Sequence, residues 1–208
     1  MELHYHPLST YSQKVLIALF EMGIEFEPKI VNMFDPEQRA QYRSLYPIGK
    51  VPLLVLDDGH PIPESSIIVE YLNSISDGVR LIPDDPTEAR KTRFLDRMYD
   101  LYLNNNVGAL FFELRKPDAE RSQSVIDGAN EKIAIMYNNM EDNLSGKHWN
   151  RGEMFTMADC AAGPPLFYAQ QIAPFDDKPN IKAFWERFSG RPSYQRIMAE
   201  AKPYLDAM

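Results

Sequence analysis

The pattern of apolar residues changes once along this chain of 208 residues, and that change constrains the fold more than any other feature. Before residue 77, short strand patterns alternate with helical ones, whereas beyond residue 86 only helical spacing recurs. The segment between them, 77–86, is rich in Asp, Pro and Gly, which is typical of a linker. We therefore expect an α/β domain over 1–76 and an all-α domain over 87–208.

The first half of the α/β part has the pattern of a strand, a helix and a second strand. A short strand ends at Pro7, and apolar residues at helical spacing then run to Gly23, a residue typical of a helix C-terminus. Residues 26–31 predict the second strand, and Pro28 places it at a sheet edge because proline cannot donate to a neighbouring strand. This order is a parallel crossover unit, which winds right-handed.

After a connecting segment, the second half of the α/β part has two strands and a helix. Residues 51–56 are an almost continuous apolar run and predict a buried strand, which 57–60 turn into a short antiparallel strand at Ile62. An amphipathic helix then ends near Ser76. The order is that of a thioredoxin-like domain, so we expect a four-stranded mixed sheet within 1–76 and no strand beyond it.

The helical part carries two clear signals of a helix start. Asp85 precedes a proline at the first helical position, and Thr156–Asp159 is a variant capping box with Asp in place of Glu. The run Asn104–Asn106 is unusual inside a helix and indicates either a kink or a polar patch. The helical patterns cover approximately residues 87–114, 118–144, 156–171, 180–190 and 193–201.

Composition limits the partners of this chain. Its net charge of −8 disfavours nucleic acid, which requires a basic surface, although a local field can still favour an anionic ligand. Its only cysteine is Cys160, which excludes an internal disulfide and a two-cysteine redox centre. The four histidines have no spacing typical of a metal site, so we expect no metal; they are His4, His6, His60 and His148.

No stretch of this chain has the length and apolar character of a membrane span, and its first residues do not have the pattern of a signal peptide. The single cysteine also fits a reducing compartment. We therefore expect a cytoplasmic protein.

Four motifs, in order along the whole chain, resemble those of soluble glutathione transferases. The segment Gly49–Leu54 and the pair Glu64–Ser65 resemble the family's glutathione site, and Phe155–Asp159 resembles a cap in its second domain. The segment Ser9–Ser12 is similar to that of serine/cysteine-type members rather than tyrosine-type ones. The resemblance implies detoxification chemistry, a homodimer, and glutathione as co-substrate for attack on an electrophilic, apolar second substrate.

The resemblance implies that Lys50, Val51, Pro52, Glu64 and Ser65 bind glutathione. Proline at the start of a buried strand is locally unfavourable, and the resemblance implies a cis Val51–Pro52 bond, which would turn the Val51 backbone outward to pair with an extended peptide. A serine at a helix start either caps the helix or helps its amides hold a carboxylate. The carboxylate of Glu64 is expected to bind the α-ammonium group of glutathione. The Lys50 side chain either binds the glycyl carboxylate at the other end of the ligand or is simply solvated.

Ser9 is the residue expected to stabilise the glutathione thiolate, with its hydroxyl as the donor and the ligand's sulfur as the nucleophile. Thr10 and Gln13 have capping-box spacing, so we expect Thr10 to cap the helix, with Ser9 just outside it. The alternative is that the Ser9 side chain only stabilises the turn that precedes the helix. The rival hydroxyls are those of Tyr5, Tyr11 and Ser12.

Aromatic and apolar residues of the helical part are candidates for the second-substrate pocket, although the same spacing is also typical of core packing. The pocket candidates are Tyr99, Tyr102, Leu103, Phe111, Phe112, Phe167 and Tyr168.

The resemblance also leaves alternative functions open. They are a non-catalytic glutathione-binding or protein-interaction module, and a glutathione-dependent isomerase, dehalogenase or peroxidase.

Overall fold

The computed structural model describes residues 1–33 and 35–207, and the chain divides into two compact units. The first, here called the N-terminal unit, contains Met1–Arg80 together with the C-terminal segment from Pro192, and the second, the helical unit, contains Leu81–Arg191.

A four-stranded mixed sheet forms the centre of the N-terminal unit. β1 (Glu2–Tyr5) pairs in parallel with β2 (Glu27–Ile30) and antiparallel with β3 (Leu53–Val55), which pairs antiparallel with β4 (Pro61–Pro63). The strand order β2-β1-β3-β4 places β2 at an edge, as Pro28 predicts. The thioredoxin-like arrangement expected from the sequence is therefore confirmed.

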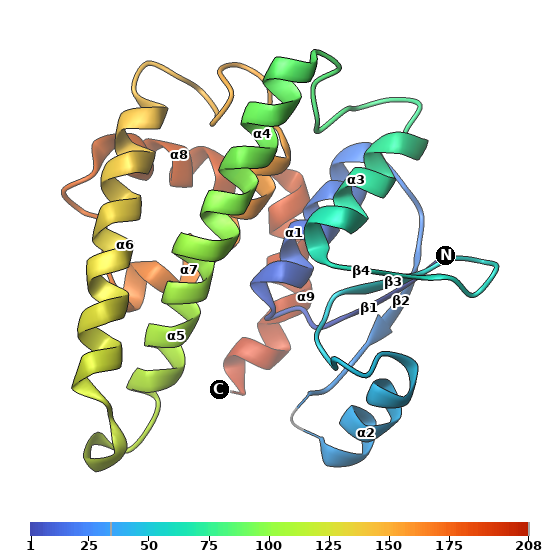
Figure 1. The fold of residues 1–208 in the computed structure, drawn as a ribbon, viewed down its shortest axis with the longest axis horizontal. Coiled ribbons are helices and arrows are strands. Elements are labelled where there is room, and N and C mark those ends of the chain that lie inside the picture. Colours follow the sequence, from blue (N-terminus) through green and yellow to red (C-terminus); the bar gives the residue numbers. More distant parts are fainter. Residues whose placement is uncertain (34, 208) are drawn as a thin grey trace. The chain divides into compact units, whose positions relative to one another are not determined.

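Helices cover both faces of this sheet. In Figure 1, α1 (Thr10–Met22) and α3 (Ser65–Ile75) lie on one side and α2 (Pro36–Leu45) lies on the other. The sequence predicted only a connecting segment where α2 occurs. The Asp35 carboxylate caps this helix by accepting from two backbone amides, but Tyr42 is its only buried residue, so no apolar stripe marks it.

The last helix, α9 (Pro192–Asp206), belongs to the N-terminal unit, where it packs against α1. Ser193 Oγ donates to the Glu21 carboxylate on α1, and Tyr5 Oη donates to Glu200 Oε1. This packing differs from the predicted second domain, which ran to Met208, a residue outside the described ones. Periodicity indicates that a segment is helical, but it does not indicate which unit its apolar face contacts.

The helical unit is built from helices joined by short connections. Its described residues form no strand, only two isolated bridges between residues 149 and 154. α4 packs against α7, and α5 packs against α6. The bounds are α4 (Pro86–Met98), a π-helical segment (Tyr99–Asn104), α5 (Asn105–Leu114), a 3₁₀ turn (Asp118–Glu120), α6 (Gln123–Leu144), α7 (Met157–Ile172) and α8 (Pro179–Ser189).

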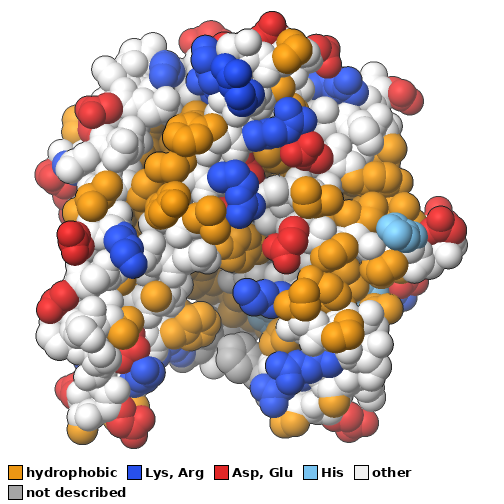
Figure 2. Space-filling view, viewed as in Figure 1, with side chains coloured by type: hydrophobic (Ala, Val, Ile, Leu, Met, Phe, Trp, Pro, Cys, Tyr) orange, Lys and Arg blue, Asp and Glu red, His pale blue; other side chains and the backbone are white. Residues whose placement is uncertain are grey.

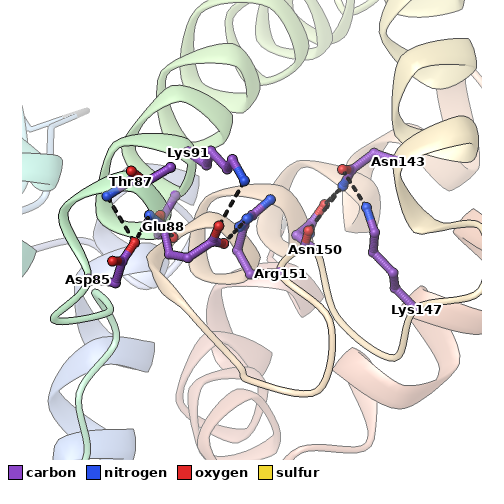
Figure 3. Close-up of polar contacts among 9 residues, drawn as sticks. Asp85, Thr87, Glu88, Lys91, Asn143, Lys147, Asn150 and Arg151 are labelled. Carbon is purple, nitrogen blue, oxygen red and sulfur yellow. Dashed lines mark hydrogen bonds and ion pairs between the residues drawn. The ribbon is translucent and has the colours of Figure 1, made fainter.

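Both predicted helix starts are confirmed. The Asp85 carboxylate accepts from the amides of Thr87 and Glu88, at 3.0 and 2.9 Å, and the Glu88 carboxylate in turn binds Lys91 and Arg151 (Figure 3). At α7, Thr156 and Asp159 form the predicted capping box. The buried Asp159 carboxylate also accepts from the backbone and side-chain amides of Asn150, at 2.8 and 2.9 Å.

The run Asn104–Asn106 lies where the π-helical segment passes into α5. Asn106 Nδ2 donates to the Tyr102 carbonyl at 2.7 Å, so its amide bonds to the backbone one turn earlier. The run therefore coincides with a local irregularity in the hydrogen-bond pattern of the helix.

Candidate functional site

The N-terminus of α1 is capped by Ser9, so the expectation that Thr10 is the cap is wrong. Ser9 Oγ accepts from the Ser12 amide at 3.3 Å, and Gln13 Nε2 donates to the Pro7 carbonyl at 2.7 Å instead of completing a capping box. A hydroxyl accepts through its lone pairs and donates through its proton. Among the described residues the Ser9 hydroxyl donates to none, so this cap leaves its proton for a ligand.

Two of the rival hydroxyls are engaged inside the protein. Tyr5 is buried and its hydroxyl donates to Glu200; burial, and then the Glu200 carboxylate, raise its pKa. Ser12 is fully buried, and its Oγ lies within hydrogen-bond distance of the His6 amide at 3.4 Å. Tyr11 is half-buried in the first turn of α1. Of the four, Ser9 is the residue that caps α1 while its hydroxyl donates to no described residue.

The segment that leads into β3 is held from α2. Tyr42 Oη donates to the Lys50 carbonyl at 2.7 Å, and the Val51–Pro52 peptide bond is cis, as the sequence analysis expected. Gly49 has a φ of 67°, a conformation that favours glycine. The backbone amide and carbonyl of Val51 make no hydrogen bond to the described part of the chain.

We predict that Tyr42→Phe weakens glutathione binding about three- to tenfold, because the lost hydrogen bond, worth about 1 kcal/mol, releases the Lys50 carbonyl. Calorimetric titration with glutathione measures this. The matched control is Tyr71→Phe on α3, whose hydroxyl makes no hydrogen bond to the described residues. Unchanged affinity in a folded Tyr42→Phe variant would contradict the prediction.

Glu64 and Ser65 form the start of α3, and no side chain caps it. Glu64 has φ 63° and ψ 135°, and among the described residues it is the only non-glycine with a positive φ. Such a conformation costs about 1–3 kcal/mol and persists only where its surroundings impose it, which often happens at ligand sites. The Ser65 hydroxyl has no partner among the described residues, so capping is not its role here.

A buried cation that the sequence analysis missed adds positive charge beside this helix start. Lys14 is 1% exposed, and its Nζ donates to Ser66 Oγ at 2.8 Å, which joins α1 to the first turn of α3. The charge reinforces the positive end of the α3 dipole, where anions bind. No sequence signal indicated this lysine, because a lysine near the start of a helix is usually exposed.

The surface over α2 is basic despite the negative net charge. Figure 2 shows Lys and Arg side chains gathered over α2 at the lower right. Arg39 and Arg43 of α2 are exposed, as is Lys50. Such a local field favours an anionic ligand. The structure thus provides basic groups near the Val51 segment and an uncapped helix N-terminus at Ser65.

The predicted second-substrate residues of the helical unit fall into three groups. Tyr99 and Leu103 are buried, and Tyr99 Oη donates to Asn150, so we leave both out of the proposed pocket. Tyr102 is 49% exposed on the π-helical segment. The other four form one aromatic cluster, with ring centroids 5.0–5.5 Å apart; they are Phe111, Phe112, Phe167 and Tyr168.

The described residues contain no group of three or more His, Cys, Asp or Glu side chains that could hold a metal ion. Cys160 is buried in α7. Within the described part of the chain, no helix combines the length and apolar character needed to cross a membrane.

Comparison with known proteins gives consistent matches over both units. The family models "Glutathione S-transferase, N-terminal domain" and "Glutathione S-transferase, C-terminal domain" match residues 8–75 and 103–192. Glutathione S-transferase 3 of Zea mays is 28% identical, over 96% of this chain and 93% of its own length. FtsZ-localized protein A of Caulobacter vibrioides is 26% identical, over 98% of this chain and 92% of its own.

A solved structure resembles the fold closely. It is a glutathione S-transferase from Methylobacillus flagellatus with glutathione bound, 28% identical, with a TM-score of 0.85 over 94% of this chain and 98% of its own.

Proposed function

This chain belongs to the glutathione S-transferase family and is a glutathione transferase, and we propose that it is of the serine type, with Ser9 donating a hydrogen bond to the glutathione sulfur. The observation that supports this choice is the hydroxyl at the N-cap of α1, which accepts from Ser12 but does not donate within the described residues. Its proton and the α1 dipole both favour a thiolate.

The energies needed for this role are modest. Lowering a thiol pKa from about 8.5 to about 6.5 requires about 2.7 kcal/mol and leaves about three quarters of the thiol ionised at pH 7. A hydrogen bond to a charged group contributes about 1.5–3 kcal/mol, and a helix terminus contributes about 0.3–1 kcal/mol. One hydroxyl and one helix end are therefore sufficient.

The peptide part of glutathione is proposed to bind along the edge that Val51 and α3 form. The unpaired backbone of Val51, beside Pro52, receives the extended cysteinyl segment, and Ser65 with the first amides of α3 holds the γ-glutamyl carboxylate. Glu64 faces the α-ammonium group, and Lys50 faces the glycyl carboxylate. Each of these two assignments pairs a charged group of glutathione with a protein group of opposite charge, which strengthens the hydrogen bond between them.

The second substrate is proposed to be an apolar electrophile. The aromatic cluster around Phe111 and Tyr168, together with the exposed Tyr102, offers flat apolar surface for an aryl group. We propose detoxification as the role and the cytoplasm as the location.

The test of the proposed activity is conjugation of glutathione to an activated aryl halide, followed by absorbance. A saturable rate well above the uncatalysed rate supports a transferase. FtsZ-localized protein A, a relative whose name is not that of a transferase, makes a binding module the specific alternative. Glutathione binding without turnover of any aryl halide, organic peroxide or isomerisable substrate would support that alternative.

We also propose a homodimer, as the resemblance implies, with the Arg90–Met98 face of α4 as the candidate contact. This face carries the 60% exposed Phe94, which burial at an interface would stabilise. Sedimentation equilibrium at micromolar concentration is expected to give twice the chain mass of 24.0 kDa. A mass of one chain would contradict the proposal.

A further inference from the structure

A pocket in the N-terminal unit lies away from the residues proposed to bind glutathione. It has a volume of about 480 Å³ and lies between the C-terminal half of α1, β2 with the residues just before it, and α9. None of Ser9, Val51 and Ser65 lines it. Phe20, which does, lies about 16 Å along α1 from Ser9, since a helix rises about 1.5 Å per residue.

The walls of this pocket are aromatic and aliphatic. The rings of Phe20 and Phe26 lie 6.1 Å apart, and Tyr5 meets Phe26 edge to face at 6.4 Å. Ile30, at the end of β2, is 43% exposed. A flat apolar group that entered the pocket would bury this surface, which favours binding.

Glu200, one of the two carboxylates that line the pocket, has no cationic partner among the described residues. Glu200 Oε1 accepts from the Tyr5 hydroxyl, but no ion pair of Glu200 occurs among the described residues. Arg196 is one turn earlier on α9 and does not pair with it; its guanidinium lies over the Phe20 ring, 4.1 Å from the centroid. Glu200 Oε2 therefore remains available as an acceptor.

The charges around the pocket favour a cation as its ligand. Glu200 and Glu25 supply two carboxylates, against one guanidinium whose charge already faces an aromatic ring. The net charge of −8 adds to this preference at long range. An ammonium group that reaches Glu200 would form a charge-assisted hydrogen bond.

We propose that this pocket is a second ligand site, separate from the glutathione site, which binds an organic cation with a flat apolar body. The ammonium group binds Glu200, and the apolar body packs against Phe26 and Ile30. The proposal does not depend on the transferase reaction, because it concerns binding at residues that the reaction does not use.

The test is calorimetric titration of the full chain at pH 7 with three probes of one shape: naphthylmethylammonium, naphthylmethanol and naphthoate. We expect one site, with the cation bound at least about tenfold more tightly than the alcohol, and the anion bound least. Glu200→Gln is expected to weaken binding of the cation about ten- to a hundredfold and to leave binding of the alcohol unchanged. Asp206→Asn, an equal charge change at an exposed position of the same helix, serves as the control.

Saturating glutathione is expected to leave the affinity for the cation within twofold. The proposal would be overturned by equal affinity for the three probes, by no detectable binding of the cation at millimolar concentration, by Glu200→Gln having no effect, or by competition with glutathione. Conjugation is measured without the cation, so none of these results changes it, and failure here is distinguishable from failure of the proposed function.

Discussion

Ser9→Ala is expected to lower the conjugation rate near pH 7 by about ten- to a hundredfold. The change removes about 1.5–3 kcal/mol of stabilisation that acts on the thiolate but not on the thiol, so the pKa of bound glutathione rises by about one to two units. Glutathione affinity is expected to stay within a few-fold, because the peptide contacts remain. A pH–rate profile measures the effect, and raising the pH is expected to recover much of the rate.

Because Ser9 is also the N-cap of α1, its two roles need separate controls. Loss of the cap in Ser9→Ala is expected to lower the free energy of unfolding by about 1 kcal/mol. Ser9→Thr keeps both the cap and the hydroxyl and is expected to retain most activity, whereas Ser9→Asp keeps only the cap and is expected to be inactive near neutral pH. Equal activity of Ser9→Ala and the unmodified protein across the pH range would show that Ser9 serves only the turn.

The double substitution Glu64→Ala with Ser65→Ala is expected to weaken glutathione binding by on the order of a hundredfold to ten-thousandfold. Each side chain is proposed to contact an ionic group of the ligand, and such hydrogen bonds contribute about 1.5–3 kcal/mol each. The fold is expected to persist, because neither side chain caps α3. Calorimetry gives the affinity, and circular dichroism confirms folding.

The matched control for this double variant is Ser74→Ala at the far end of α3, where the hydroxyl donates to the carbonyl of Tyr71 and to no other described residue. It is expected to leave glutathione affinity unchanged. A folded double variant that binds glutathione as tightly as the unmodified protein would rule out the assignment of Glu64 and Ser65.

The sequence predicted the elements that carry a periodic apolar pattern. The sheet, α1, α3 and the long helices follow from it, and the Asp85 cap follows from local helix-start chemistry. α2 was missed because it buries only Tyr42 and so has no apolar stripe. α9 was recognised as a helix, but its packing against α1 depends on tertiary contacts that periodicity does not contain.

For the site, the motif positions were predictable but their geometry was not. Thr10 and Ser9 are adjacent candidates for the cap, and only the backbone path decides between them. The positive φ of Glu64 is imposed by its surroundings, since no local rule favours it for glutamate. The contact of Lys14 with Ser66 joins residues 52 positions apart, which sequence spacing cannot indicate.

The serine-type mechanism requires bound glutathione to be ionised near neutral pH. Ultraviolet difference absorbance of the thiolate, recorded against pH, measures this ionisation directly. In the complex with the unmodified protein, we expect a midpoint about two units below that of a free thiol, near 6.5. The same titration with Ser9→Ala is expected to shift back by about one to two units. A midpoint for the unmodified complex equal to that of free glutathione would contradict the account.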